Sequence, residues 1–174
     1  MSTPLLIRPE TPSDIQAIHD LTAAAFASME ISDHTEQFVI DALREAGALS
    51  LSLVAELDGK VVGHIAFSPI TLSDGRSDWY GAGPLSVLPM LQRQGIGSAL
   101  MRAGLDQLKA AGAHGCCLVG HPGYYERFGF VHPVGLGMEG VPLEVFFALA
   151  FDGNYPSGTI DFHPAFFASG NQAD

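Results

Sequence analysis

The chain has little cysteine and no long apolar run. Its 174 residues include only two cysteines, Cys116 and Cys117, which are adjacent. Neighbouring side chains on a strand point to opposite faces, so this pair argues against a structural disulfide and fits a reducing cytosol. No run of about 18 apolar residues exists, so we expect no membrane span. Residues 1–10 have neither a basic lead-in nor a long apolar core, so we expect no export signal and a cytoplasmic protein.

Basic residues are also scarce. The chain has 8 Lys and Arg against 19 Asp and Glu, which gives a formal net charge of −11. Because lysine and arginine drive binding to a phosphate backbone, we expect no nucleic acid partner. The acidic balance would favour a cationic substrate by long-range attraction, although an ordinary acidic protein can have the same composition.

Length and composition predict a single domain over residues 1–174. With 47% hydrophobic residues, the chain is long enough for one real core and too short for two comfortable ones. The sequence has no internal repeat, low-complexity segment or linker. We therefore expect residues 133–174 to be a C-terminal extension of the same domain.

The hydrophobic period alternates between that of a helix and that of a strand, which predicts a mixed α/β (α+β) fold. Helices are expected at residues 11–25, 36–45 and 99–110, with a short one at 123–127. Strands are expected at residues 5–8, 51–57, 61–67, 79–88, 116–119, 129–131, 144–151 and 159–162. The turn signals Asp58-Gly59 and Asp74-Gly75 predict that three of these strands form an antiparallel meander.

The most informative stretch is the glycine turn at residues 92–98, Gln-Arg-Gln-Gly-Ile-Gly-Ser. It lies between an apolar strand and a helix, so several backbone N–H groups and the positive end of the helix dipole converge on one spot. Such a spot suits an anion, and a diphosphate above all. Gly95 and Gly97 would let the ligand lie on the backbone, and Gln92 and Arg93 could donate to phosphate oxygens.

Other phosphate-binding loops fit this turn poorly. No Gly-Lys-Ser/Thr follows it, which excludes the P-loop of nucleoside triphosphate enzymes. The third glycine of a dinucleotide fingerprint would fall at Leu100, and the preceding strands predict a meander rather than a βαβ unit. A nicotinamide- or flavin-dependent enzyme is therefore the less favoured alternative.

A second motif spans residues 123–130, Gly-Tyr-Tyr-Glu-Arg-Phe-Gly-Phe. Two tyrosines at the start of a short helix can place one ring in the core and one hydroxyl in a cleft. A phenol can donate a proton to a departing thiolate, because its pKa of about 10 exceeds a thiol's roughly 8.5. Taken alone, such a pair is more often a packing feature.

The segment His114-Gly115-Cys116-Cys117, with His121, has residue types that bind zinc. Adjacent cysteines on a strand diverge, however, so four convergent ligands are hard to build there. We therefore expect no metal.

Together, the glycine turn and the tyrosine motif resemble those of the GNAT superfamily of acyl-CoA-dependent N-acetyltransferases. The family's phosphate motif is Gln/Arg-x-x-Gly-x-Gly/Ala, which Gln92, Gly95 and Gly97 match. Its later signature is an aromatic-Tyr pair four residues before Gly-Phe, which Tyr124-Tyr125 and Gly129-Phe130 match. The segment containing this signature looks especially like a bacterial branch of small acetyltransferases.

The resemblance covers roughly residues 5–131 and, more loosely, the tail. It implies the GNAT fold, a mostly antiparallel sheet flanked by helices in which two splayed strands form a coenzyme A cleft. It also implies acetyl-CoA as cosubstrate, held through its pantetheine by one splayed strand and through its diphosphate by the glycine turn. The implied coenzyme-binding residues are Leu85, Ser86, Val87, Gln92, Arg93, Gln94, Gly95, Ile96, Gly97, Ser98 and Tyr124. Tyr125 takes the family's general-acid position and would protonate the coenzyme thiolate.

The incoming amine must also lose a proton before it attacks. A lysine-like amine has a pKa of about 10.4, so neutralising it near pH 7 costs roughly 4 to 5 kcal/mol. Many relatives place a glutamate on the strand before the glycine turn, and residues 79–87 contain none. His64 on the neighbouring predicted strand is the substitute we favour as catalytic base, ahead of His121. The commoner role for such a residue is that of a hydrogen-bonded histidine within a sheet.

The function that the resemblance implies is acetyl transfer from acetyl-CoA to a small-molecule or peptide amine. We expect direct transfer in a ternary complex, because Cys116 and Cys117 have no obvious activating partner for a covalent intermediate. Eight of the 11 phenylalanines lie at or after Phe128, so the C-terminal third could wall an apolar acceptor pocket or bury a homodimer face. The alternative is a sensor that binds an acyl-CoA without turnover.

Overall fold

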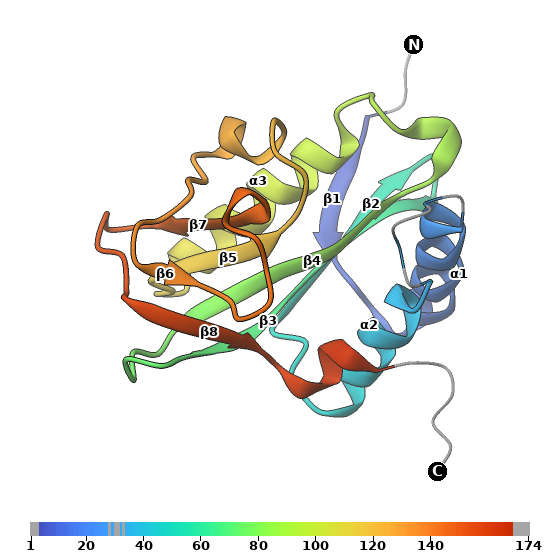
Figure 1. Cartoon of the computed structure of the whole chain (residues 1–174). Coiled ribbons are helices and arrows are strands. Elements are labelled where there is room, and N and C mark those ends of the chain that lie inside the picture. The colour runs from blue at the N-terminus through green and yellow to red at the C-terminus, as the bar shows by residue number, and fades with distance from the viewer. Residues whose placement is uncertain (1–3, 28, 30–31, 33, 169–174) are drawn as a thin grey trace.

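The fold is an open sheet with helices on both faces (Figure 1). The computed structural model describes residues 4–27, 29, 32 and 34–168. Its helices are α1 (Ile15–Phe26), α2 (Glu36–Glu45) and α3 (Ile96–Ala110). Its strands are β1 (Leu6–Pro9), β2 (Leu51–Leu57), β3 (Lys60–Leu72), β4 (Trp79–Val87), β5 (Gly115–Val119), β6 (Leu136–Gly137), β7 (Phe146–Ala150) and β8 (Gly158–Phe162). Within these described ranges, no helix is both long enough and apolar enough to span a bilayer.

The main sheet has the strand order β1-β2-β3-β4-β5-β7. Neighbours pair antiparallel except for β4 and β5, which run parallel. Asp58 and Gly59 both have positive φ (53° and 77°) and form the two-residue turn between β2 and β3 that the Asp-Gly signal predicts. The predicted antiparallel meander and the mixed, mostly antiparallel fold class are confirmed.

Strands β4 and β5 pair over only a short length. Trp79, Tyr80 and Gly81 pair with residues 115–117, and no further pair between the two strands occurs among the described residues. The rest of β4, residues 82–87, therefore has one backbone edge that β5 does not occupy. An unpaired strand edge can accept an extended ligand as if it were another strand.

The alternation of side chains along the strands assigns each helix to one face of the sheet. Leu53 packs into the same core cluster as Leu100 of α3. Its neighbour Val54 packs instead with Ile18 of α1 and Ile40 of α2. Helices α1 and α2 thus cover one face and α3 the other, as Figure 1 shows.

The predicted start of the first helix is confirmed with one difference. The carboxylate of Asp14 accepts a hydrogen bond from the backbone N–H of Thr11 (2.7 Å), as a capping box requires. Residues Pro12–Asp14 form a 3-10 turn, and α1 begins after it at Ile15. The Arg8 guanidinium, 2.7 Å from the Asp14 carboxylate, lowers the pKa of that carboxyl to about 2.

Several predicted boundaries differ from the structure. Residues 129–131 form no strand, because Gly129 is left-handed (φ 100°) and only Val131 reaches β7, in an isolated bridge to Ala148. The predicted strand at 144–151 is shortened at its start by a 3-10 turn, Leu143–Val145. Helix α3 begins at Ile96 rather than at residue 99, so the glycine turn itself supplies its first turn.

Candidate active site

A cavity of about 1110 Å³ lies where β4 and β5 separate. Its wall is formed by β4, the start of α3, the loop after β5, the end of α1 and part of the C-terminal segment. Ligand pockets commonly measure roughly 300–1,000 Å³, so this one is large enough for an extended ligand together with a second, smaller one.

The glycine turn forms one end of this cavity. Arg93 and Gly95 have positive φ (66° and 90°), and α3 begins directly afterwards at Ile96. The first α-helical hydrogen bond runs from the Ala99 N–H to the Gly95 carbonyl. The N–H groups of residues 96–98 therefore have no carbonyl partner within the helix. We call the backbone of residues 94–98 the cradle. These N–H groups and the helix dipole make it suited to an anion.

Gly97 keeps the cradle open. A Cβ at this position would lie 3.3 Å from the Tyr124 hydroxyl oxygen and 3.7 Å from Leu85 Cδ2, which is tight for the first of these neighbours. The methyl group would also stand on the cavity wall, between the backbone and any ligand. A bound diphosphate therefore fits glycine here better than any larger residue.

Most of the predicted coenzyme-binding residues lie on the cavity wall, and two do not. The residues on the wall are Leu85, Val87, Gln92, Arg93, Gly95, Ile96, Gly97, Ser98 and Tyr124. Ser86 points to the opposite face of the sheet, where it is 1% exposed, so only its backbone can meet a ligand. The side chain of Gln94 lies near the Met90 carbonyl (3.5 Å) and also lies off the wall. The amide of Gln92 donates to the Val87 carbonyl (3.0 Å), which ties the turn to the end of β4.

Tyr124 contacts the cradle at its last residue, and Tyr125 packs beside Tyr124. The Tyr124 hydroxyl lies 3.2 Å from Ser98 Oγ, and the Arg127 guanidinium lies 4.5 Å from the centre of the Tyr124 ring. Tyr125 stands nearly perpendicular to Tyr124 and packs against Phe147 (ring centres 5.6 Å apart). Burial, with a smaller effect of Tyr124, raises the pKa of Tyr125. Its hydroxyl therefore keeps its proton and can act as a donor.

Gly120, the residue after β5, is a positioning residue that sequence reasoning did not single out. A Cβ on Gly120 would lie 2.4 Å from Cε2 of Tyr125 and 3.1 Å from its hydroxyl oxygen. The tyrosine ring therefore occupies the space that any other residue would fill. From the sequence alone, this glycine predicts only the end of a strand.

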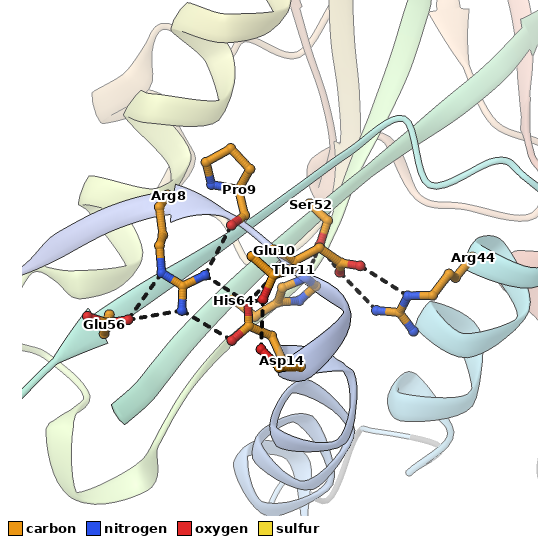
Figure 2. Close-up of polar contacts among 10 residues, drawn as sticks. Arg8, Pro9, Glu10, Thr11, Asp14, Arg44, Ser52, Glu56 and His64 are labelled. Carbon is orange, nitrogen blue, oxygen red and sulfur yellow. Dashed lines mark hydrogen bonds and ion pairs between the residues drawn. The ribbon is translucent and has the colours of Figure 1, made fainter. Parts of the chain in front are cut away.

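His64 lies outside the cavity, on the face of the sheet opposite to the cradle. It pairs with Ser86 across β3 and β4 and is 0% exposed. Figure 2 shows it beside Ser52 and Glu10. The Ser52 hydroxyl donates to the Glu10 carboxylate, so at 2.7 Å it accepts a hydrogen bond from His64 Nε2–H. Arg44 in turn donates to Glu10 (2.9 Å).

Burial lowers the pKa of His64 to about 4, and the Glu10 carboxylate opposes that effect only in part. The ring is therefore neutral near pH 7. Its Nδ1 has no hydrogen-bond partner among the residues that the structure describes. Because His64 does not reach the cavity wall, this geometry favours the structural role of a sheet histidine over that of a base.

The cysteines are placed for packing. Cys116 and Cys117 are both buried free thiols, and burial raises the pKa of Cys117 to about 12. Such thiols are poor nucleophiles at neutral pH. Across the described part of the chain, His, Cys, Asp and Glu side chains form no group of three or more that could hold a metal ion.

Comparison with known proteins identifies the family. The sequence profile of the Acetyltransferase (GNAT) family matches residues 15–130, which contain both motifs. The chain belongs to this family. The uncharacterized N-acetyltransferase YhbS of Escherichia coli K12 is 38% identical to this GNAT chain over 127 residues, 72% of this chain and 73% of YhbS.

Two solved GNAT structures are similar over nearly the whole chain. A GNAT family acetyltransferase from Brucella melitensis in complex with acetyl-CoA is 47% identical, with a TM-score of 0.84 over 94% of this chain and 99% of that one. E. coli YhbS in complex with CoA is 32% identical, with a TM-score of 0.85 over 97% of this chain and 96% of that one. The protein is thus a GNAT acetyltransferase.

Proposed function

We propose that this enzyme transfers an acetyl group from acetyl-CoA to a primary amine by direct transfer in a ternary complex. The observation that carries the proposal is that the cradle, the open edge of β4 and Tyr125 border one cavity. That two similar GNAT structures hold acetyl-CoA or CoA supports the same ligand in this cavity.

The coenzyme would be held by backbone groups at two places. Its diphosphate lies on the N–H groups of the cradle, with Arg93 close by to supply positive charge. Its pantetheine amides pair with the backbone of Leu85 and Val87 along the free edge of β4. Both contacts leave the part of the cavity that lies away from the cradle free for the acceptor.

Acetyl-CoA supplies an activated acetyl thioester, and the residues of the chain orient it and move protons. The neutral amine nitrogen of the acceptor attacks the thioester carbonyl carbon, so that a C–N bond forms and the C–S bond breaks. Tyr125 gives its hydroxyl proton to the departing sulfur, and the attacking nitrogen gives its second proton to the base or to solvent as the acetamide forms. Tyr125 then regains a proton from solvent. Overall, an ammonium group and acetyl-CoA give an acetamide, the coenzyme thiol and one proton.

The acceptor proton needs a route out of the site. His121 lies on the cavity wall and His64 does not, so we assign the base role to His121, acting directly or through water. This reverses the order of preference predicted for the two histidines from the sequence. His64 is left with its bond to Ser52 inside the sheet.

The proposed reaction is tested by measuring free thiol release and acetylated product together across a panel of primary amines. We expect both in equal amounts with at least one amine. If acetyl-CoA binds tightly and neither product forms across a broad panel, the sensor alternative replaces this proposal.

The proposal also covers where the enzyme acts and whether it forms a dimer. Both cysteines are free thiols, as expected in a reducing cytosol, and we place the reaction in the cytoplasm. A homodimer stays a prediction of the phenylalanine-rich C-terminal third. Sedimentation velocity would decide between one chain and two.

A further inference from the structure

The cavity has two ends with different chemistry. Phe162 marks one end, since its ring lies against Gly81 on β4, where a Cβ would be 2.5 Å from it. The cradle follows Val87, six residues further along the strand, or roughly 20 Å at about 3.3 Å per residue. The pantetheine arm runs along β4 from the cradle toward Phe162. Its sulfur, and hence the acceptor, belongs toward this far end.

The wall of the far end is mainly apolar and aromatic. Phe162 and Phe166 stack with ring centres 4.7 Å apart and planes at 20°. Phe26, at the end of α1, also lies on the wall. Phe166 lies in the 3-10 turn Pro164–Phe167, which packs against α2. Phe166 packs with Val39 and Leu43 of α2, and Glu36, the first residue of that helix, lies on the same cavity wall.

Charge is divided between the two ends. Arg93 belongs to the turn that forms the cradle, and Arg127 lies over the ring of Tyr124, whose hydroxyl meets Ser98 of the cradle. Among the described residues of the wall, Glu36 is the one carboxylate, and it lies on α2 rather than near the cradle. Both of its oxygens lie 2.8 Å from the Ser32 hydroxyl, which fixes the carboxylate in place.

We propose that the acceptor is a primary amine carried on a compact apolar body, bound with its ammonium group against Glu36. The apolar body lies against Phe166 and the neighbouring aromatic rings. This assignment rests on the proposed acetyl transfer and adds the class of substrate. A carboxylate is the natural partner of an ammonium group, and aromatic faces attract the same charge.

The charge of the protein favours the same class. With a formal net charge of −11, the protein draws cations toward it and repels anions. An acceptor with a carboxylate beside its amine would place that group near Glu36, where like charges repel. The amine of an ordinary free amino acid is therefore disfavoured, and an aryl- or alkylamine is favoured.

The test measures binding to the protein saturated with CoA, so that it does not depend on turnover. Three probes separate the contribution of the amine from that of the aromatic ring. 2-Phenylethylamine has both groups, ethylamine lacks the ring, and 3-phenylpropionate carries a carboxylate in place of the amine. We expect 2-phenylethylamine to bind roughly tenfold more tightly than either of the others. Equal affinity for all three would overturn the assignment.

The matched variants lie at the two ends of one helix. Glu36→Gln keeps the size of the side chain and removes its charge, and we expect it to weaken 2-phenylethylamine roughly tenfold or more. Glu45→Gln makes the same change about 13 Å away at the exposed end of α2 and should alter affinity less than about twofold. Phe166→Ala should weaken 2-phenylethylamine and leave ethylamine unaffected. Wild-type affinity in Glu36→Gln would contradict the proposal.

The same variants distinguish the acceptor assignment from the acetyl transfer itself. If 2-phenylethylamine binds in a Glu36-dependent way and no thiol is released from acetyl-CoA, the transfer fails and the acceptor site stands. If the amine is acetylated and Glu36→Gln leaves its KM unchanged, the transfer stands and the acceptor site falls.

Discussion

The Tyr124 hydroxyl lies 3.2 Å from Ser98 Oγ, although the two residues are 26 positions apart in the chain. This contact joins the tyrosine motif to the cradle. It places Tyr125, the next residue, beside the cavity that the cradle begins. The proposed coenzyme site and the proposed proton donor are therefore held in one arrangement by the packing of β5, α3 and the loop that follows β5.

Replacing the Tyr125 hydroxyl should slow the reaction without loosening the coenzyme. Tyr125→Phe keeps the ring that packs against Phe147 and removes the proton donor, so kcat should fall about 100-fold or more. Tyr124→Phe is the matched control: it removes the contact to Ser98, so it should act mainly on the Kd for acetyl-CoA. Steady-state kinetics and calorimetry measure the two effects. Equal kcat in wild type and Tyr125→Phe would remove Tyr125 from the mechanism.

The pKa of Tyr125 predicts the alkaline side of the pH profile. Burial raises this pKa above its ordinary value of about 10, so the hydroxyl keeps its proton near neutral pH and well above it. We therefore expect no fall in kcat from Tyr125 below about pH 10. A descending limb near pH 8 to 9 that is lost in Tyr125→Phe would show that the phenol ionises earlier than this.

A methyl group at Gly97 should weaken acetyl-CoA roughly tenfold or more, because it stands between the cradle N–H groups and the diphosphate. The fold should tolerate it, since alanine is favoured over glycine in a helix by about 1 kcal/mol. Calorimetry gives the Kd for acetyl-CoA, and thermal unfolding gives the stability of Gly97→Ala. Unchanged affinity in a folded variant would place the diphosphate elsewhere.

Gly120→Ala tests the positioning of Tyr125. Because a Cβ there would overlap the tyrosine ring, the ring must turn away, and kcat should fall by about tenfold or more. The Kd for acetyl-CoA should change much less, since Gly120 belongs neither to the cradle nor to the β4 edge. A further test is the double variant with Tyr125→Phe, in which the effect of Gly120→Ala on kcat should largely disappear. Additive losses would show that Gly120 acts by another route.

The buried His64 should make stability depend on pH. Its pKa falls from about 6.5 in the unfolded chain to about 4 in the folded protein, so the unfolded state binds the proton first as the pH drops. Stability is full above about pH 6.5 and is lost progressively toward pH 4, by about 3 kcal/mol in total. The pKa of Asp14 is lowered to about 2, so the stability that its carboxylate contributes is lost only at lower pH.

Denaturant unfolding between pH 7 and pH 5 measures this effect of His64. The single tryptophan, Trp79, is 2% exposed and reports on unfolding by its fluorescence. His64→Gln should flatten the dependence on pH, while acetyl-CoA binding persists because residue 64 lies off the cavity wall. A curve for His64→Gln parallel to that of wild type would assign the acid sensitivity to other groups.

Local signals in the sequence were enough to predict the cradle and the antiparallel meander within the main sheet. Gly95 and Gly97 have a specific spacing between a strand and a helix. The Asp58-Gly59 turn sets the first pairs of β2 and β3, before a β-bulge between Ala55 and Glu56 shifts the register. These features depend on neighbours in the chain, so the sequence alone carries them. The direction of a side chain across strands is harder to predict. His64 and Ser86 both turned out to point to the face away from the cavity, because the strand pleat alternates with every residue.

The far end of the cavity could not be predicted, because it is built by distant segments. Glu36 begins α2, and Phe166 lies 130 residues later in a 3-10 turn, with no periodic pattern linking them. The many late phenylalanines indicated an apolar surface, but their burial inside a chain or between chains depends on tertiary contacts. Gly120 is similar, since its role depends on the position of the Tyr125 ring.

A crystal structure of this chain with CoA is the most direct test of whether the cradle binds the diphosphate of acetyl-CoA. We predict diphosphate oxygens within about 2.7–3.2 Å of the backbone nitrogens of Ile96, Gly97 and Ser98. The pantetheine should follow the β4 edge toward Tyr125. Density for CoA elsewhere on the protein, with the cradle closed by its own side chains, would contradict the account.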